Sequence, residues 1–249
     1  MIDTHCHIHW VDFPLEVDGV ISRAHENGVN QMICVGTSEA DSKLAIDFAA
    51  KHEGIYATIG IHPHYAEGGL GKLEKLIDEN HDKIVAIGEI GLDYFHNHSP
   101  HADQINLLRS QIKLALKYDL PIIFHVRDAY EDFWPVFDEF TGIRGVLHSF
   151  TDTADNLQKG LDKGLYIGIN GYSTFTKDEA QKAMFASIPV SKTILETDAP
   201  YLTPTPFRGK INESAYIKNI AEYHGVVTGV GFDEISSITT ANARELFNL

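Results

Sequence analysis

Eight short apolar runs, separated by longer segments with helical spacing, constrain the fold of this 249-residue chain more than any other feature. The runs are rich in β-branched and apolar residues, as is typical of strands that are covered on both faces of a parallel sheet. Parallel strands need crossover connections, which helices usually supply. The alternation therefore predicts an α/β fold with a parallel sheet. The runs cover residues 1–6, 29–37, 55–63, 84–94, 121–128, 145–150, 165–171 and 193–200.

The segments between these runs show the periodicity of amphipathic helices. Residues 101–119 place Ile105, Leu108, Ile112 and Ala115 three or four positions apart, which puts them on one helical face. Residues 153–164 begin with a threonine that can cap a helix and end at a glycine that can stop one. We expect helices in both segments, and the closing sequence ARELFNL indicates another.

Eight strand–helix units in a chain of this length predict a (β/α)8 TIM barrel that forms a single domain over residues 1–249. An open, doubly wound sheet is the competing architecture, and it requires a glycine-rich phosphate loop after the first strand. The sequence THCHIHW stands in that position instead. We see no internal repeat or linker. Residues 203–212, TPTPFRGKIN, form the clear Pro/Gly loop of the chain.

The composition of the chain restricts its expected cellular compartment and its expected binding partners. The chain has no long apolar run of the kind that spans a bilayer, and its start lacks the features of a signal peptide. We therefore expect a cytoplasmic protein without a membrane partner, with Cys6 and Cys34 as reduced thiols. The formal net charge of −15 at pH 7 repels nucleic acid over most of the surface. A polyanionic substrate would need a local positive site, which bound divalent cations can supply.

Three histidines alternate along DTHCHIHW, residues 3–10. Side chains two positions apart share a face of a strand, so His5 and His7 are expected to point one way and Cys6 the other. A metal ion can draw two such rings together. The pattern alone is weak evidence, because a polar strand face or an unprocessed tag explains it as well.

Further ionisable residues lie near the carboxyl ends of other predicted strands, where the active sites of (β/α)8 barrels are found. Each alone has a structural explanation, as a hydrogen-bonded core histidine, a salt-bridged carboxylate or a turn cap. Together these residues would form a buried polar cluster that destabilises the fold unless a metal ion binds them. The set therefore predicts a metal site. Its members are His5, His7, Glu89, His125, His148 and Asp198.

Six ordered motifs resemble those of the TatD-type metal-dependent deoxyribonucleases of the amidohydrolase barrel superfamily. They are DTHCH, GIHPH, GEIGLDY, PIIFHVRDA, HSFT and ETDAPYLTP followed by RGKIN. The resemblance runs in order from residue 2 to the final NARELF, which is essentially the whole chain. It implies a hydrolase that uses two divalent ions to cleave DNA phosphodiester bonds, often as a 3′-to-5′ exonuclease.

By motif, the resemblance implies that His5 and His7 hold one ion and that His125 and His148 hold the other, with Glu89 between both. Asp198 would bind the first ion, contact the attacking water and accept its proton. The catalytic pair is then Asp198 and Glu89. Histidine and carboxylate ligands suit Zn²⁺ or Mn²⁺, whereas phosphodiester chemistry often uses Mg²⁺, so the sequence does not choose among the three.

Donors for a substrate phosphate are predicted at His62, in GIHPH, and at Arg127 and Arg208. Their structural alternatives are a turn packed around Pro63 and ordinary surface salt bridges. Glu196 is expected to support a ligand histidine or simply to be a buried acid. The histidines outside these motifs are expected on the surface, at positions 25, 52, 81, 96, 98, 101 and 224.

Two positions depart from the family pattern. His9 replaces an acid that usually follows DTHCH, and it is either an extra ligand or a surface ring. Asp152 replaces the glycine of the usual HSFTG and is expected to alter the turn there. Neither change removes an expected ligand.

The resemblance favours single-stranded DNA or DNA 3′ ends as the substrate of a monomeric enzyme. Two alternatives remain. The first is hydrolysis of an amide, ester or lactone, because related barrels use the same metals on these substrates. The second is a metal-binding or scaffold role without catalytic activity.

Overall fold

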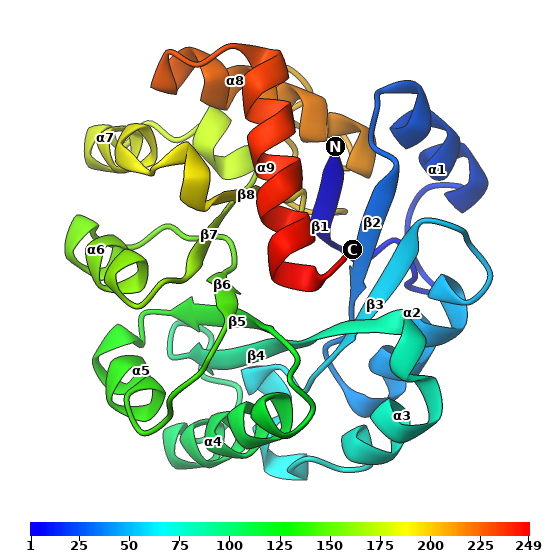
Figure 1. Cartoon of the computed structure of the whole chain (residues 1–249), viewed down its shortest axis with the longest axis vertical. Coiled ribbons are helices and arrows are strands. Elements are labelled where there is room, and N and C mark those ends of the chain that lie inside the picture. The colour runs from blue at the N-terminus through cyan, green and yellow to red at the C-terminus, as the bar shows by residue number, and fades with distance from the viewer. The chain divides into compact units, whose positions relative to one another are not determined.

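The computed structural model describes residues 1–249 and contains eight strands in one sheet. The strands follow one another in the sheet in the same order as in the sequence (Figure 1). They are β1 (Ile2–Cys6), β2 (Gln31–Val35), β3 (Ile55–Ile59), β4 (Ile84–Asp93), β5 (Ile122–Arg127), β6 (Gly145–Leu147), β7 (Tyr166–Ile169) and β8 (Thr193–Leu195).

At least one α-helix follows each strand, which is the arrangement of the (β/α)8 barrel that the sequence predicts. The helices are α1 (Val17–Glu26), α2 (Glu39–Ala49), α3 (Leu73–Asn80), α4 (His101–Lys117), α5 (Tyr130–Phe137), α6 (Ala154–Asp162), α7 (Glu179–Ser187), α8 (Ile217–Thr228) and α9 (Phe232–Phe247). None of these helices combines the length and the apolar character that a membrane span requires.

The chain packs as two compact units, one of residues 1–34 and 149–249 and the other of residues 35–148. A single domain over residues 1–249 therefore stays a prediction. In the first unit, β1 pairs with β2 and β7 pairs with β8, all in parallel. A further bridge joins Cys6, at the end of β1, to Ala199 beyond β8. Helix α9, red in Figure 1, packs against both β1 and β8.

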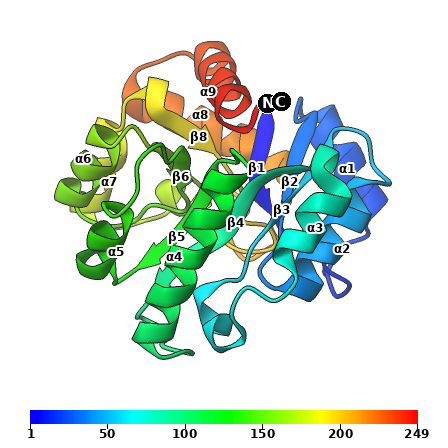
Figure 2. The same ribbon diagram turned by 60° about the horizontal axis from the view of Figure 1, so that its bottom comes forward.

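In the second unit, β3, β4, β5 and β6 pair in parallel in that order. Helix α4 packs along β4, as Figure 2 shows. Gly91 of β4 is paired with His125 of β5, and a Cβ at Gly91 would lie 1.7 Å from the His125 carbonyl oxygen. Only glycine permits this approach, which brings the polar residues of the two strands together.

The two helices predicted from spacing are present. Helix α4 covers most of residues 101–119 and buries Leu108, Ile112 and Ala115. Helix α6 begins after Thr153, whose side chain accepts a hydrogen bond from the Asn156 amide. Asp152 Oδ1 also accepts hydrogen bonds from the Thr153 amide and the Asn156 side chain at 2.7 and 2.6 Å. The aspartate that departs from the family pattern thus supports the start of α6.

Most of the predicted strands run past the observed carboxyl ends, and the difference matters most for β6 and β8. We expect residues 145–150 and 193–200 to be extended, but β6 ends at Leu147 and β8 at Leu195. Ser149 and Asp198 have φ angles of 48° and 58°, in the left-handed region that ends a strand. His148 and Asp198 therefore lie in the segments just after their strands rather than on them.

His224 is not a surface residue, which corrects the expectation for this position. It lies on α8 with 1% of its surface exposed, and its Nε2 has no hydrogen-bond partner. Burial lowers the pKa of His224 to about 4, because the charged ring would lose its hydration without gaining a partner. The imidazole is therefore neutral in the folded protein.

The buried His224 predicts a loss of stability in mild acid. The unfolded chain takes up a proton on this ring as the pH falls through about 6.5, whereas the folded chain does so only near pH 4. The free energy of unfolding should drop by about 2 kcal/mol from this residue between pH 7 and pH 5. Urea titrations of the wild type and His224→Leu at both pH values measure this difference. An equal pH dependence in the two proteins contradicts the prediction.

Candidate metal centre

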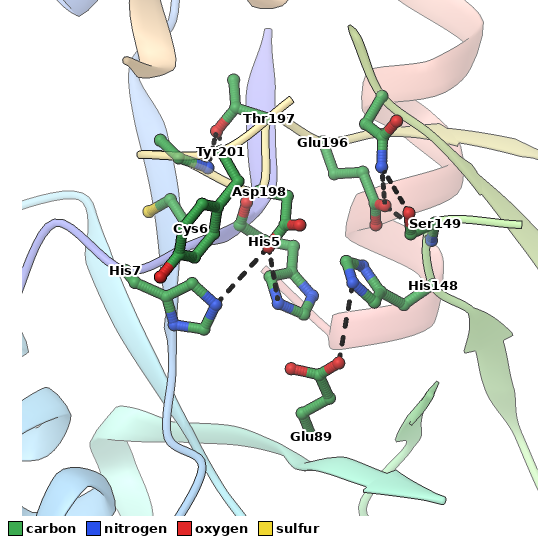
Figure 3. A network of polar contacts seen from close by, with 12 residues as sticks. His5, Cys6, His7, Glu89, His148, Ser149, Glu196, Thr197, Asp198 and Tyr201 are labelled. Atoms are coloured by element: carbon green, nitrogen blue, oxygen red, sulfur yellow. Dashed lines mark hydrogen bonds and ion pairs between the residues drawn. The ribbon is translucent and has the colours of Figure 1, made fainter. Parts of the chain in front are cut away.

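The first cluster of predicted ligands lies in the unit of residues 1–34 and 149–249. His5 Nε2 and His7 Nε2 lie 3.7 and 3.5 Å from Asp198 Oδ1 (Figure 3). Two backbone hydrogen bonds hold the segments together, from the Asp198 amide to the His5 carbonyl and from the His7 amide to the Ala199 carbonyl, both at 2.8 Å. The end of β1 and the segment after β8 thus position these three side chains jointly.

A buried carboxylate ties the two segments together behind the ligands. Asp3 accepts hydrogen bonds from the amide and the hydroxyl of Thr197 at 2.9 and 2.6 Å. Burial raises the pKa of Asp3 to about 7, although these hydrogen bonds oppose the rise. Asn212 donates from Nδ2 to the Thr197 carbonyl at 2.8 Å, so the loop of residues 203–212 is also joined to this segment.

The histidines of DTHCHIHW have different surroundings. Cys6 points away from the ligands, as predicted, and its thiol lies 3.4 Å from the Ile33 carbonyl oxygen. The ring of His7 stacks on Trp10 with 4.3 Å between centroids. His9 is 6% exposed and its ring centroid lies 6.1 Å from that of His7. His9 is therefore not a surface ring.

The second cluster lies in the unit of residues 35–148. Glu89 Oε1 is 2.8 Å from His125 Nδ1 and 3.6 Å from His148 Nε2. Backbone hydrogen bonds fix these positions, because the Glu89 amide donates to the Gly36 carbonyl and the His148 amide to the Phe124 carbonyl. Figure 3 shows the His148 ring directed at the Glu89 carboxylate. Strands β4 and β5 and the segment just after β6 therefore bring one carboxylate and two imidazoles together.

His125 lies between two carboxylates. Its Nδ1 faces Glu89, and its Nε2 lies 3.1 Å from Asp93 Oδ2. Burial lowers the pKa of His125, but the hydrogen bonds to Asp93 and Glu89 outweigh it and raise the pKa to about 9. Burial likewise raises the pKa of Asp93, yet hydrogen bonds from His125 and His96 bring it well below its usual range. Asp93 is therefore ionised and acts only as an acceptor.

His62 is held as one tautomer. It precedes a 3₁₀ turn (Pro63–Gly68), and its Nδ1 accepts the His64 amide at 3.2 Å. Burial, together with the nearby His125, lowers the pKa of His62 well below its usual value, so the ring is neutral. A neutral ring that accepts at Nδ1 carries its proton on Nε2, and this atom lies 3.7 Å from Glu89 Oε1. His62 can therefore donate a hydrogen bond at the cluster.

Both predicted phosphate-binding arginines are exposed and stack on aromatic rings. The guanidinium carbon of Arg127 lies 4.1 Å from the centroid of Phe95. That of Arg208 lies 3.6 Å from the centroid of Phe175, and its Nη1 donates to the Thr203 carbonyl at 2.8 Å. Each side chain is thus held in place with N–H groups that remain available to a ligand.

Glu196 is a buried acid with a structural role. Its Oε1 accepts the Ser149 amide at 2.7 Å and lies 3.4 Å from Asn170 Nδ2 (Figure 3). Asn170 also donates to the Ser149 hydroxyl at 2.7 Å. These contacts hold the turn after His148 against the ends of β7 and β8.

The donors of both clusters suit divalent metal ions. In the second cluster, the Glu89 carboxylate lies beside the imidazoles of His125 and His148. In the first cluster, two imidazoles face one carboxylate. Mixed nitrogen and oxygen donors of this kind bind Zn²⁺ or Mn²⁺. A cation beside Glu89 would take the place of the proton on His125 Nδ1, so the residues present fit a metal.

Comparison with known proteins identifies the family. The model of the TatD related DNase family matches residues 2–248. The chain belongs to this family. Among its relatives is an uncharacterized metal-dependent hydrolase, YabD of Bacillus subtilis, which is 37% identical with 100% of this chain and 99% of the relative covered. A protein of Erwinia tasmaniensis named 3′-5′ ssDNA/RNA exonuclease TatD is 33% identical, and the match covers 100% of both chains.

Solved structures of TatD proteins have the same fold. The crystal structure of YjjV, a TatD homologue from Escherichia coli, superposes with a TM-score of 0.93 at 28% identity and covers 100% of this chain and 98% of that one. A TatD family hydrolase from Entamoeba histolytica gives 0.89 at 26% identity, with 99% and 97% covered. The chain is therefore a metal-dependent hydrolase of the TatD family with a (β/α)8 fold.

Asp93 is a site residue that the motif analysis does not single out. It stands in GEIGLDY four positions after Glu89, on the same strand. Residues separated by an even number on a strand share a face, and this spacing is the signal that could have identified it. Its three imidazole neighbours, His64, His96 and His125, come from different segments and are not visible from spacing.

Proposed function

We propose that this TatD protein is a deoxyribonuclease that hydrolyses phosphodiester bonds from the 3′ ends of single-stranded DNA and uses two divalent ions. The observation that carries the proposal is the position of His125 between the buried carboxylates of Glu89 and Asp93, in a family where relatives of 33% identity over their whole length are named exonucleases. The proposed enzyme is a cytoplasmic monomer with two free thiols.

In this proposal, His5, His7 and Asp198 hold one ion, His125 and His148 hold the other, and Glu89 serves both. Bound divalent ions, as Mg²⁺, Mn²⁺ or Zn²⁺, lower the pKa of water and offset negative charge on a phosphoryl group. Asp198 Oδ1 orients the attacking water and accepts its proton, as a general base. Its partial exposure, with 17% of the side chain accessible, leaves room for that water.

The substrate phosphates are bound by His62, Arg127 and Arg208 in this proposal. His62 donates from Nε2 as a neutral ring, so it adds no charge that would repel a nearby cation. The two arginines form charge-assisted hydrogen bonds with phosphate oxygens, and their aromatic neighbours hold the guanidinium planes in place. They supply local positive charge on a chain whose net charge is −15.

A degradation assay tests this function against the main alternative. The purified protein is incubated with Mn²⁺ or Mg²⁺ and single-stranded DNA that carries a dye at its 5′ end. We expect labelled fragments that shorten stepwise from the 3′ end, and a chelator should stop the reaction. An oligonucleotide with a blocked 3′ end is the control. Hydrolysis of esters, lactones or dipeptides without any action on DNA would favour an amidohydrolase-type activity instead.

A further inference from the structure

Asp93 makes an unusual set of contacts around a single carboxylate oxygen. His96 Nδ1, His64 Nε2 and His125 Nε2 lie 2.8, 3.0 and 3.1 Å from Oδ2. The side chain of Asp93 is fully buried. A carboxylate can only accept hydrogen bonds, so the nitrogen of each ring that faces Asp93 carries a proton.

Hydrogen bonds to the backbone of Asp93 fix the position of this residue. Its amide donates to Gln104 Oε1 at 2.8 Å, and its carbonyl accepts from Gln104 Nε2 at 3.2 Å. Its Oδ1 accepts the His96 amide at 2.9 Å. Gln104 is itself fully buried and donates to the Ser99 carbonyl at 2.9 Å. The carboxylate is therefore a rigid acceptor rather than a mobile surface group.

For His125, a proton on Nε2 has a direct consequence. The other nitrogen, Nδ1, lies 2.8 Å from Glu89 Oε1. A ring that holds its proton at Nε2 can present the lone pair of Nδ1 to a cation beside Glu89. Histidine ligands generally donate their second ring nitrogen to a carboxylate or a carbonyl, which fixes both the tautomer and the orientation of the ring.

We propose that Asp93 is a positioning residue that holds His125 with Nε2 protonated and Nδ1 directed to the metal beside Glu89. The proposal rests on the metal-dependent function above and adds a residue that the ligand assignment does not contain. His64 and His96 contact the same oxygen of Asp93, whereas His125 is the ring that joins Asp93 to Glu89.

Zinc binding by four proteins tests the proposal: the wild type, Asp93→Ala, Asp93→Asn and the matched control His96→Ala. Affinities are measured by competition with a chelator of known zinc affinity. We expect one zinc ion to bind about 10- to 100-fold more weakly to Asp93→Ala, with a smaller loss in Asp93→Asn, which keeps an acceptor oxygen. His96→Ala should stay close to the wild type. Circular dichroism checks that the variants are folded.

The tautomer of His125 gives a second readout that is independent of activity. Long-range ¹H–¹⁵N spectra of the zinc-loaded wild type, with His125 assigned from His125→Gln, should show a protonated Nε2 and a zinc-bound Nδ1. Wild-type affinity in Asp93→Ala, or zinc on Nε2, overturns the proposal. Zinc binding that depends on Asp93 in a protein inactive on DNA would overturn the proposed nuclease function alone. A wild type that binds no zinc, Mn²⁺ or Mg²⁺ would overturn both.

Discussion

Glu89→Ala is expected to reduce the turnover of DNA by about a thousandfold or more, which corresponds to about 4 kcal/mol of lost transition-state stabilisation. Glu89 is 5% exposed and faces both His125 and His148. In the proposed site its carboxylate serves both ions, so its removal disrupts the binding of each. Initial rates on labelled single-stranded DNA with saturating Mn²⁺ measure the effect.

Two further variants make this test specific. Glu89→Gln keeps the size of the side chain and loses its charge, so it should be nearly as inactive if the charge matters. Glu139→Ala removes an exposed carboxylate that pairs with Arg109 on the surface and should keep wild-type activity. A folded Glu89→Ala protein with more than a tenth of wild-type activity would refute the proposal that the Glu89 carboxylate serves both ions.

Asp198→Asn is expected to lower kcat by about 10²- to 10⁴-fold while KM for the oligonucleotide changes little, because the amide cannot accept the proton of the attacking water. Asp198 has a φ angle of 58°, and asparagine tolerates this conformation well, so the backbone should keep its shape. Steady-state kinetics with the Mn²⁺-loaded protein give both constants. The exposed Asp155→Asn on α6 is the control. A kcat within threefold of the wild type would exclude Asp198 as the general base.

Much of the fold and of the ligand clusters follows from the sequence for one physical reason. The carboxyl ends of parallel strands lie at one edge, so polar residues that end apolar runs are expected to meet there. Glu89 and His125 sit on paired strands as expected, and His5, His7 and Asp198 meet because β1 is hydrogen-bonded to the segment after β8. The metal assignment of these residues stays a prediction.

The features that the sequence does not reveal depend on backbone conformation or on contacts between distant segments. Ser149 and Asp198 adopt left-handed conformations just after β6 and β8, so these strands end earlier than predicted. The apolar runs contain no residue pattern that predicts these conformations. The role of Asp93 depends on rings from three segments. His224 is different, since Ile220, Ala221, His224 and Gly225 have helical spacing and lie buried on one face of α8. The helical spacing of these residues was therefore a signal in the sequence that could have predicted a buried His224.

The central claim is that six side chains form one centre for two metal ions. Anomalous diffraction from a crystal of the Mn²⁺-loaded protein with a short oligonucleotide tests it most directly. We predict two peaks, the first contacted by His5, His7 and Asp198 and the second by His125 and His148, with Glu89 touching both. A single peak, or two peaks that share no carboxylate, would contradict the account.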